Sequence, residues 1–137
     1  KYSRCCIDTS DGVFNALNTI SEMSGTGFIV NHLPYLKSGL LLAKALHLPK
    51  EMMFFGECGE YELLFTVSRE KEAAFFQEAA EKKLLFYPLG AVTEDGKKIL
   101  RGQAGEIDLA GFNLKARDYV KIKEYVRDVV DFLPRGD

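Results

Sequence analysis

The chain has 137 residues, of which 47% are hydrophobic and ten are phenylalanines, so it is long enough to build one substantial core. Its formal net charge is −2 and its lysines and arginines are dispersed, which argues against electrostatic binding to nucleic acid. There is no membrane-length apolar run and no signal-peptide pattern, and the three cysteines lack metal-ligand spacing. We therefore expect a cytoplasmic protein with reduced thiols and no membrane partner.

The first third of the chain predicts two strands and two helices. An apolar run over 3–7 is typical of a strand, and apolar residues then recur at helical spacing over 11–24. Gly25 is well placed to end this helix in the left-handed conformation. A second strand is predicted over 27–31 and a short apolar helix over 37–47.

The next predicted pair is a strand followed by a helix. Residues 61–67 are rich in aromatic, aliphatic and β-branched residues, which is typical of a strand. Ser68 is a suitable cap for a helix over 69–82. The side of this helix that we expect to be buried consists of Phe75, Phe76, Ala79 and Ala80.

The segment that follows predicts strands and a tight turn. A strand over 84–93 contains Pro88, which we expect to interrupt it. Residues 94–96 (Glu-Asp-Gly) then read as a hairpin turn into 97–101, and 105–109 form a short strand or loop. Strands that alternate with helices, plus one hairpin, predict an α+β fold in which helices cover a mixed sheet.

The final predicted helix, over 116–133, has a strongly two-sided pattern. Its apolar stripe begins at Val120 or Ile122, and charged residues occupy the opposite face. The helix either packs on its own domain or docks a second domain or subunit. The rest of the stripe consists of Tyr125, Val126, Val129, Val130 and Leu133.

The most informative stretch lies where the first strand gives way to the first helix. Asp8, Ser10 and Asp11 fall within four positions there, and Gly12 follows them. Helix N-termini attract anions, and two carboxylates are compatible with a phosphate only when a divalent cation lies between them. The pattern therefore indicates a magnesium-bridged phosphate site. The structural alternative is that Ser10 or Asp11 merely caps the helix.

The same stretch resembles the D-x-S-D-G-L signature of thiamine-monophosphate kinases, which belong to the aminoimidazole ribonucleotide (AIR) synthase superfamily. Four further segments resemble that family in the same order, and the likeness extends from residue 5 to about 112. The five segments are Asp8-Thr9-Ser10-Asp11-Gly12-Val13, Ser24-Gly25-Thr26-Gly27, Leu33-Pro34, Gly59-Glu60-Tyr61-Glu62-Leu63-Leu64-Phe65-Thr66-Val67 and Gly90-Ala91-Val92-Thr93.

The resemblance implies a fold and a site. Residues 1–137 would form a single AIR synthase-type C-terminal domain, an α/β sandwich, with 115–137 as an extra C-terminal helix. Asp8 and Asp11 would hold Mg²⁺ while Ser10 and Gly12 contact the ATP phosphates. The family also has an N-terminal domain, absent from this sequence, which binds ATP and pairs in a homodimer. A small-molecule phosphate substrate is the acceptor.

The segments that would contact the acceptor differ in sequence from the family pattern. Glu60 replaces an Asp of the motif, and 57–59 read Glu-Cys-Gly instead of Gly-Gly-Glu. Near the end, Phe112 stands in a segment that resembles G-W-D-H-F without its Asp and His. Glu60 and Phe112 are the candidate substrate-binding residues, and no catalytic side chain is assigned.

Three functions follow as hypotheses. The first is an ATP- and Mg²⁺-dependent kinase related to thiamine-monophosphate kinase, with a possibly changed acceptor. The second is an AIR-synthase-like ligase or cyclase, which releases free phosphate instead of a phosphorylated product. The third is a non-catalytic domain that binds nucleotide or supports assembly. Under each of them we expect the isolated chain to be inactive, because half of the proposed site would be missing.

Overall fold

The computed structural model describes residues 1–57, 62–102 and 105–134, which form an α+β fold as expected. Within this part of the chain, no helix combines the length and the apolar character that crossing a membrane requires. The elements in chain order are β1 (Ser3–Asp8), α1 (Val13–Ser24), β2 (Gly27–Val30), α2 (Lys37–Ala45), the 3₁₀ helix η1 (Lys50–Phe55), β3 (Leu63–Val67), α3 (Arg69–Glu81), β4 (Gly90–Thr93), β5 (Lys98–Gly102), β6 (Gly105–Asp108), the 3₁₀ helix η2 (Ala116–Asp118) and α4 (Ile122–Phe132).

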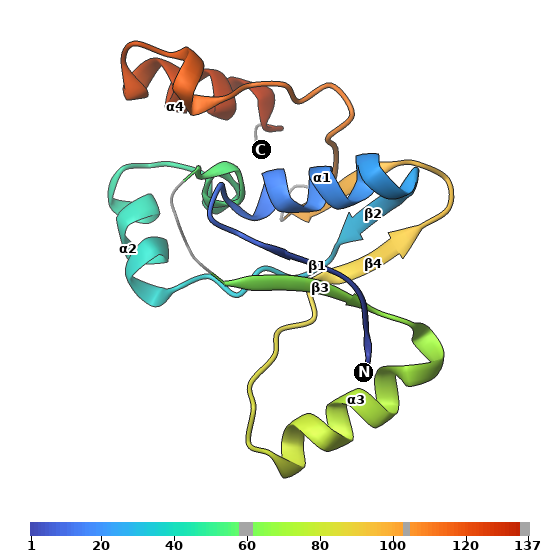
Figure 1. The fold of residues 1–137 in the computed structure, drawn as a ribbon. Helices are drawn as coiled ribbons and strands as arrows, with labels where there is room; N and C mark the ends of the chain where they lie inside the picture. Colours follow the sequence, from blue (N-terminus) through green and yellow to red (C-terminus); the bar gives the residue numbers. More distant parts are fainter. Residues whose placement is uncertain (58–61, 103–104, 135–137) are drawn as a thin grey trace.

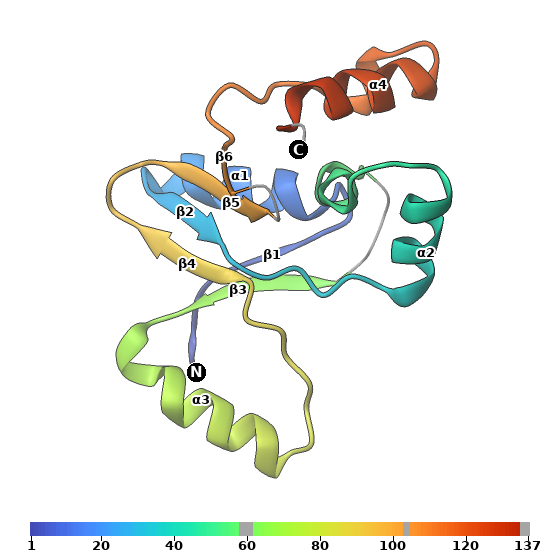
Figure 2. The same ribbon diagram turned by 180° about the vertical axis from the view of Figure 1, so that it is seen from behind.

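The larger sheet has four strands in the order β4-β2-β5-β6. Strand β2 is antiparallel to β4 and parallel to β5, and β5 is antiparallel to β6. Helix α1 lies over this sheet, and η1 and α4 lie farther along the same side (Figures 1 and 2). The shared core consists of Phe14, Phe28, Val30, Phe54, Phe55, Leu100, Ile107, Leu109, Phe112, Tyr125, Val129 and Leu133.

The hairpin predicted at residues 94–96 is wrong. Strands β4 and β5 do not pair with each other, because β2 lies between them and pairs with both. The connection crosses the start of β2, where the Phe28 N–H donates to the Lys97 carbonyl oxygen at 2.7 Å. Gly27 permits this crossing, because a Cβ at that position would overlap the Lys97 backbone. The paired hairpin joins β5 to β6 instead.

The second sheet is a two-stranded antiparallel ribbon of β1 and β3, in which Asp8 pairs with Leu63. Helix α3 lies on the side of this ribbon away from α1 (Figures 1 and 2). The aromatic rings of Phe65, Phe75 and Phe86 meet there, with centroids 4.8–5.7 Å apart. The ribbon and α3 thus form a small satellite cluster beside the main core.

Several details of this region differ from the predictions. Strand β3 begins at Leu63, and of the segment 84–93 only Gly90–Thr93 is a strand, because Pro88 lacks the N–H that a ladder needs. Ser68 occupies the N-cap position of α3, but its hydroxyl makes no capping hydrogen bond.

The predicted buried side of α3 is also only partly correct. Ala79 is buried and Phe75 half-buried, whereas Phe76 and Ala80 are exposed. The reason is that α3 packs on a two-stranded ribbon, which is too narrow to cover a whole helix face.

The left-handed cap at Gly25 is confirmed by its φ of 65°. The last predicted helix, however, is interrupted, since 116–133 contain η2 and then α4. Helix α4 packs on its own domain, because Tyr125, Val129 and Leu133 are each at most 4% exposed. Val120 and Ile122, the first positions of the proposed stripe, are exposed.

A buried hydrogen bond joins α4 to η1. The Tyr125 hydroxyl donates to the Phe55 carbonyl oxygen at 2.7 Å, and burial raises the pKa of Tyr125 to about 12, so the phenol stays neutral. Replacing Tyr125 by phenylalanine leaves that carbonyl buried without this donor. We expect Tyr125→Phe to lower the free energy of unfolding by about 1–3 kcal/mol in urea titrations.

The matched control is Tyr119→Phe, because the Tyr119 hydroxyl donates to the Asp128 carboxylate at 3.0 Å in a part-buried setting where water can replace it. We expect its loss to be smaller. Equal losses for the two variants would contradict a special role for the bond to Phe55.

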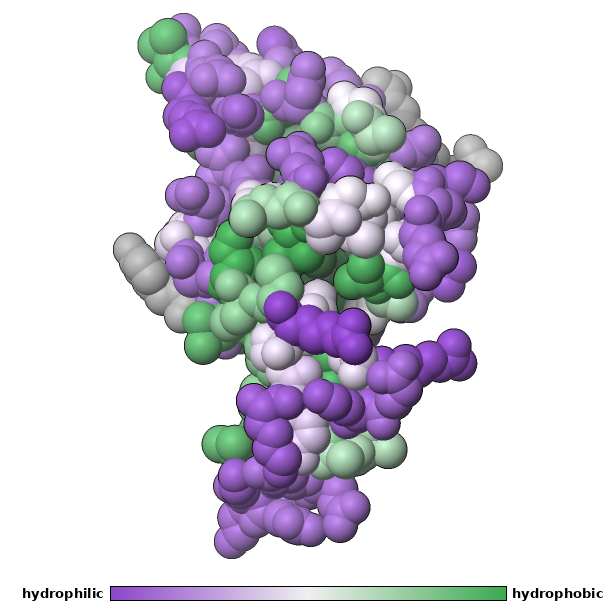
Figure 3. Space-filling view, turned by 45° about the vertical axis from the view of Figure 1, so that its right-hand side comes forward, coloured by the Kyte–Doolittle hydropathy of each residue, from purple (hydrophilic) through white to green (hydrophobic). Residues whose placement is uncertain are grey.

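Large apolar side chains remain exposed outside the core. Figure 3 shows apolar residues gathered across the middle of one face, between two more hydrophilic ends. On α2 and just after it, Leu41, Leu42 and Leu46 are all about 60–70% exposed. Exposed apolar groups of this density are typical of a surface that meets another protein or domain.

Candidate functional site

The turn between β1 and α1 forms one side of a hollow of about 160 Å³. The structure therefore brings together Asp8, Ser10, Asp11 and Gly12, the candidate metal- and phosphate-binding residues. The complete lining consists of Ile7, Asp8, Ser10, Asp11, Gly12, Asn15, Ala16 and Thr19.

Asp8 is the last residue of β1, and its carboxylate is exposed at the rim of the hollow. Its Oδ1 accepts hydrogen bonds from the Ser10 hydroxyl and, at 2.9 Å, from the Ser10 backbone N–H. These bonds, the one from the hydroxyl first, hold the pKa of Asp8 below its usual value. The side chain is therefore a negatively charged oxygen donor at neutral pH.

The capping alternative for Ser10 does not describe this turn. Gly12, not Ser10 or Asp11, occupies the N-cap position of α1, and no side-chain hydrogen bond caps the helix within the described residues. The Ser10 hydroxyl turns to Asp8 instead. The first N–H groups of α1, which have no acceptor within the helix, remain directed toward the start of the helix.

Gly12 determines the path of the turn. Its φ is 91°, a value that disfavours residues with a side chain, and a Cβ there would overlap the carbonyl oxygen of Gly56. Gly56 directly follows η1. The back of the turn is therefore packed against η1 by backbone contact, while its front faces the hollow.

Two lining residues, Asn15 and Thr19, were not predicted. The Asn15 amide donates to the Asp11 carbonyl oxygen, and the Thr19 hydroxyl donates to the Asn15 carbonyl oxygen, both at 2.8 Å. They follow Asp11 at steps of four, so they continue its face of α1. That spacing is the sequence signal that could have identified them.

Glu62, which directly precedes β3, lies next to the turn. The Thr9 N–H donates to the Glu62 carbonyl oxygen at 2.9 Å, and the Glu62 N–H donates to the Thr9 hydroxyl at 3.2 Å. Glu60, a candidate substrate-binding residue, lies outside the described residues. The structure therefore places Glu62 beside the turn and leaves the role of Glu60 a prediction.

Phe112, the other candidate substrate-binding residue, belongs to the core. It is 8% exposed, its ring stacks on Phe55 at 4.2 Å, and it meets Phe14 edge-on at 5.0 Å. Contact with a substrate stays a prediction for this residue, and the ring has a packing role in any case.

The donor set of the hollow suits one kind of metal. Among the described residues, no group of three or more His, Cys, Asp or Glu side chains is arranged to hold an ion. Mg²⁺ typically keeps several waters and binds through one or two carboxylates together with substrate phosphates. Asp8 and Asp11 therefore fit a Mg²⁺ ion that arrives with a phosphate.

Comparison with known proteins identifies the family of the chain. A family model described as "AIR synthase related protein, C-terminal domain" matches residues 4–103. The chain belongs to this family. The match runs from β1 into the end of β5, so it includes the turn between β1 and α1 and leaves α4 outside.

One curated relative of the domain is the "Thiamine-monophosphate kinase" of Nitrosopumilus maritimus (strain SCM1). It is 26% identical over 109 residues, which are 80% of this chain and 34% of that protein. The chain thus spans about a third of the length of this relative.

Proposed function

We propose that this AIR synthase-related domain supplies the magnesium- and phosphate-binding corner of an ATP-dependent phosphotransferase. The observation that carries the proposal is the hollow at the start of α1, where Asp8, Ser10 and Asp11 lie together. The thiamine-monophosphate kinase relative favours a kinase over other ATP-using enzymes.

The roles of the side chains follow from the chemistry of phosphoryl transfer, which depends on positioning and charge neutralisation more than on covalent catalysis. Asp8 and Asp11 would hold Mg²⁺, which neutralises phosphate charge when it is bound. The Ser10 hydroxyl and the first N–H groups of α1 would bind phosphate oxygens. Gly12 lets the backbone approach them closely.

The rest of the active site would come from elsewhere in a longer, cytoplasmic protein. An N-terminal domain would complete the ATP site, and the parent would act as a homodimer on a small phosphorylated acceptor, with Glu60 and Phe112 near that acceptor. The exposed leucines of α2 and the 34% coverage of the relative support a missing partner domain. The isolated chain would bind Mg-nucleotide weakly and would have no catalytic activity.

The test is an assay of the intact parent with Mg-ATP and thiamine monophosphate, in which ADP and thiamine diphosphate are measured. We expect Asp11→Asn to lower kcat/KM about 100-fold or more, because a group that stabilises transferring charge is lost without a change of size. Asp118→Asn, on the exposed η2, is the matched control and should leave turnover unchanged.

The products separate the competing functions. Thiamine diphosphate that Asp11→Asn abolishes supports the kinase, and ADP with free phosphate instead indicates AIR-synthase-like chemistry. Tight ATP binding without ADP would indicate a non-catalytic domain. Turnover that is unaffected by Asp11→Asn would contradict the proposed role of the corner.

A further inference from the structure

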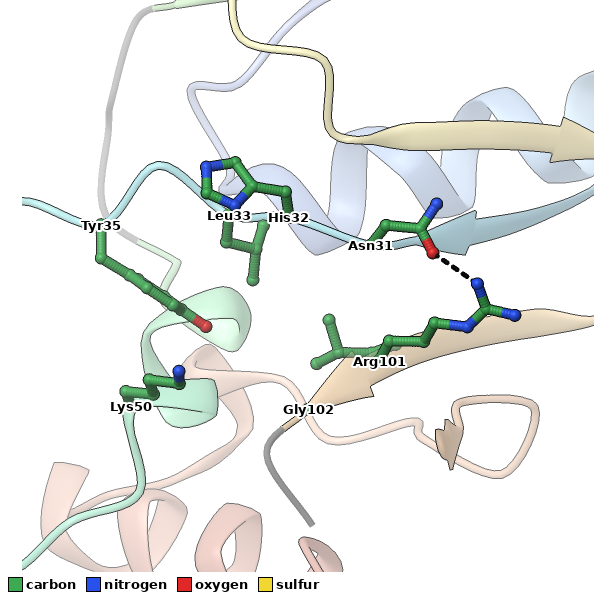
Figure 4. Close-up of a pocket in the computed structure, with 8 residues that line it drawn as sticks. Asn31, His32, Leu33, Tyr35, Lys50, Arg101 and Gly102 are labelled. Carbon is green, nitrogen blue, oxygen red and sulfur yellow. Dashed lines mark hydrogen bonds between the residues drawn. The ribbon is translucent and has the colours of Figure 1, made fainter. Parts of the chain in front are cut away.

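A second hollow, of about 260 Å³, lies at the carboxyl ends of β2 and β5. These two strands form the parallel pair in the four-stranded sheet. Figure 4 shows Leu33 and Tyr35 entering it from the segment after β2, Lys50 from the start of η1 and Arg101 from β5. None of these residues belongs to the corner at Asp8.

The position in the fold favours ligand binding. In open α/β sheets, ligands bind in the crevice beyond the carboxyl ends of the parallel strands, where the following segments diverge, and β2 and β5 repeat this arrangement within a mixed sheet. Here the chain after β2 leads into residues 31–35, whereas β5 leads toward its hairpin with β6. The volume falls slightly below the roughly 300–1,000 Å³ of typical small-molecule pockets, so a compact ligand fits.

Two polar side chains at one side of the hollow, Lys50 and Tyr35, are hydrogen-bond donors. The Lys50 ammonium lies 5.9 Å from the centroid of the Tyr35 ring and has no ion-pair partner among the described residues. In Figure 4 the ammonium and the Tyr35 hydroxyl both point into the space. Burial, and then the carboxylate of Glu51, raise the pKa of Tyr35, so its hydroxyl keeps its proton.

Arg101 is held in place at the opposite side. Its Nη1 donates to the Asn31 Oδ1 at 2.9 Å, as Figure 4 shows, and its Nε donates to the Glu106 Oε1, also at 2.9 Å. Because the Asn31 oxygen accepts from Arg101, the amide nitrogen of Asn31 is left as a donor. Leu33 and Leu100 are the apolar side chains that line the hollow.

From this arrangement we infer that the hollow at the carboxyl ends of β2 and β5 binds a small phosphate monoester, separately from the corner at Asp8. Lys50 and Tyr35 bind the phosphate, because its several oxygens can accept hydrogen bonds from the ammonium and from the hydroxyl. Asn31 and Arg101 bound the far side of the hollow, where their head groups bind each other. The organic group packs against Leu33 and Leu100.

The two hollows share one structural element. Lys50, the first residue of η1, lines the second hollow, while Gly56, directly after η1, touches Gly12 in the first. A ligand on Lys50 would therefore contact the same element that supports the turn at Asp11. The inference itself does not depend on the proposed kinase activity.

The test is a titration of the ¹⁵N-labelled 137-residue chain with phenyl phosphate, inorganic phosphate and benzoate, in Mg²⁺-free buffer, followed by amide chemical shifts. We expect phenyl phosphate to shift the amides of residues 31–35, 50 and 100–102 and to bind more tightly than either other probe. Lys50→Met should weaken its binding about tenfold, since a charge-assisted hydrogen bond is lost.

Matched variants make the result decisive. Lys97→Met removes an exposed lysine on the β4–β5 connection and should leave the affinity unchanged, whereas Tyr35→Phe should weaken binding and keep the ring. Asp11→Asn should have no effect in this assay. Equal effects of Lys50→Met and Lys97→Met, shifts confined to residues 8–19, or equally tight benzoate binding would each overturn the inference.

Discussion

Replacing Gly12 by alanine should lower the free energy of unfolding by about 2–5 kcal/mol, a large part of the stability of an ordinary domain. Gly12 has φ 91° and ψ 158°, a region that glycine alone commonly occupies, and a residue with a side chain is strained there by about 1 kcal/mol or more. Overlap with the Gly56 carbonyl oxygen adds about 1–3 kcal/mol, because either the turn or η1 must move. Urea unfolding followed by circular dichroism measures the loss.

Gly25 provides a control for a glycine with positive φ and no close contact. Its φ is 65°, yet a Cβ there would meet no atom within 4 Å. Gly25→Ala should therefore cost the conformational strain alone, about 1–2 kcal/mol. A loss for Gly12→Ala no greater than that for Gly25→Ala would show that the contact with Gly56 is unimportant.

Phe112→Ala should be equally damaging, with a loss of about 3–5 kcal/mol, because it leaves a cavity among the rings of Phe14, Phe55 and Phe132. The same urea titration measures it. Phe76→Ala, on α3, is the control and should cost much less, since that ring is 38% exposed.

This experiment also bears on the predicted role of Phe112 in substrate binding. If the ring serves packing alone, the conservative Phe112→Leu variant of the parent protein should keep its KM for the acceptor while its melting temperature falls. A raised KM at unchanged stability would instead support direct contact with the substrate.

The sequence predicted the local elements well because their signals are local. Strand β1, helix α1 and the left-handed cap at Gly25 each depend on residues close together in the chain. The hairpin at residues 94–96 failed for the opposite reason. A turn of this composition suits a hairpin, and nothing near it shows that β2, some 65 residues earlier, lies between the two strands.

The candidate site shows the same difference between local sequence signals and long-range contacts. Asp8, Ser10, Asp11 and Gly12 are contiguous, so a motif could identify them, whereas the backing of the turn by Gly56 is a contact across more than forty residues. The second hollow is built from 31–35, 50 and 100–102, three segments that no motif joins. Pairing and close approach over such separations are properties of the folded chain.

The bond between Tyr125 and Phe55 has a consequence for how the family likeness is interpreted. The match to the family model ends at residue 103, yet η1 is hydrogen-bonded to α4, which begins at Ile122. A helix outside that match thus supports, through Phe55 and Gly56, the turn at Gly12. In relatives that share the motif but differ in this C-terminal segment, we expect the same carboxylates to be held with a different rigidity.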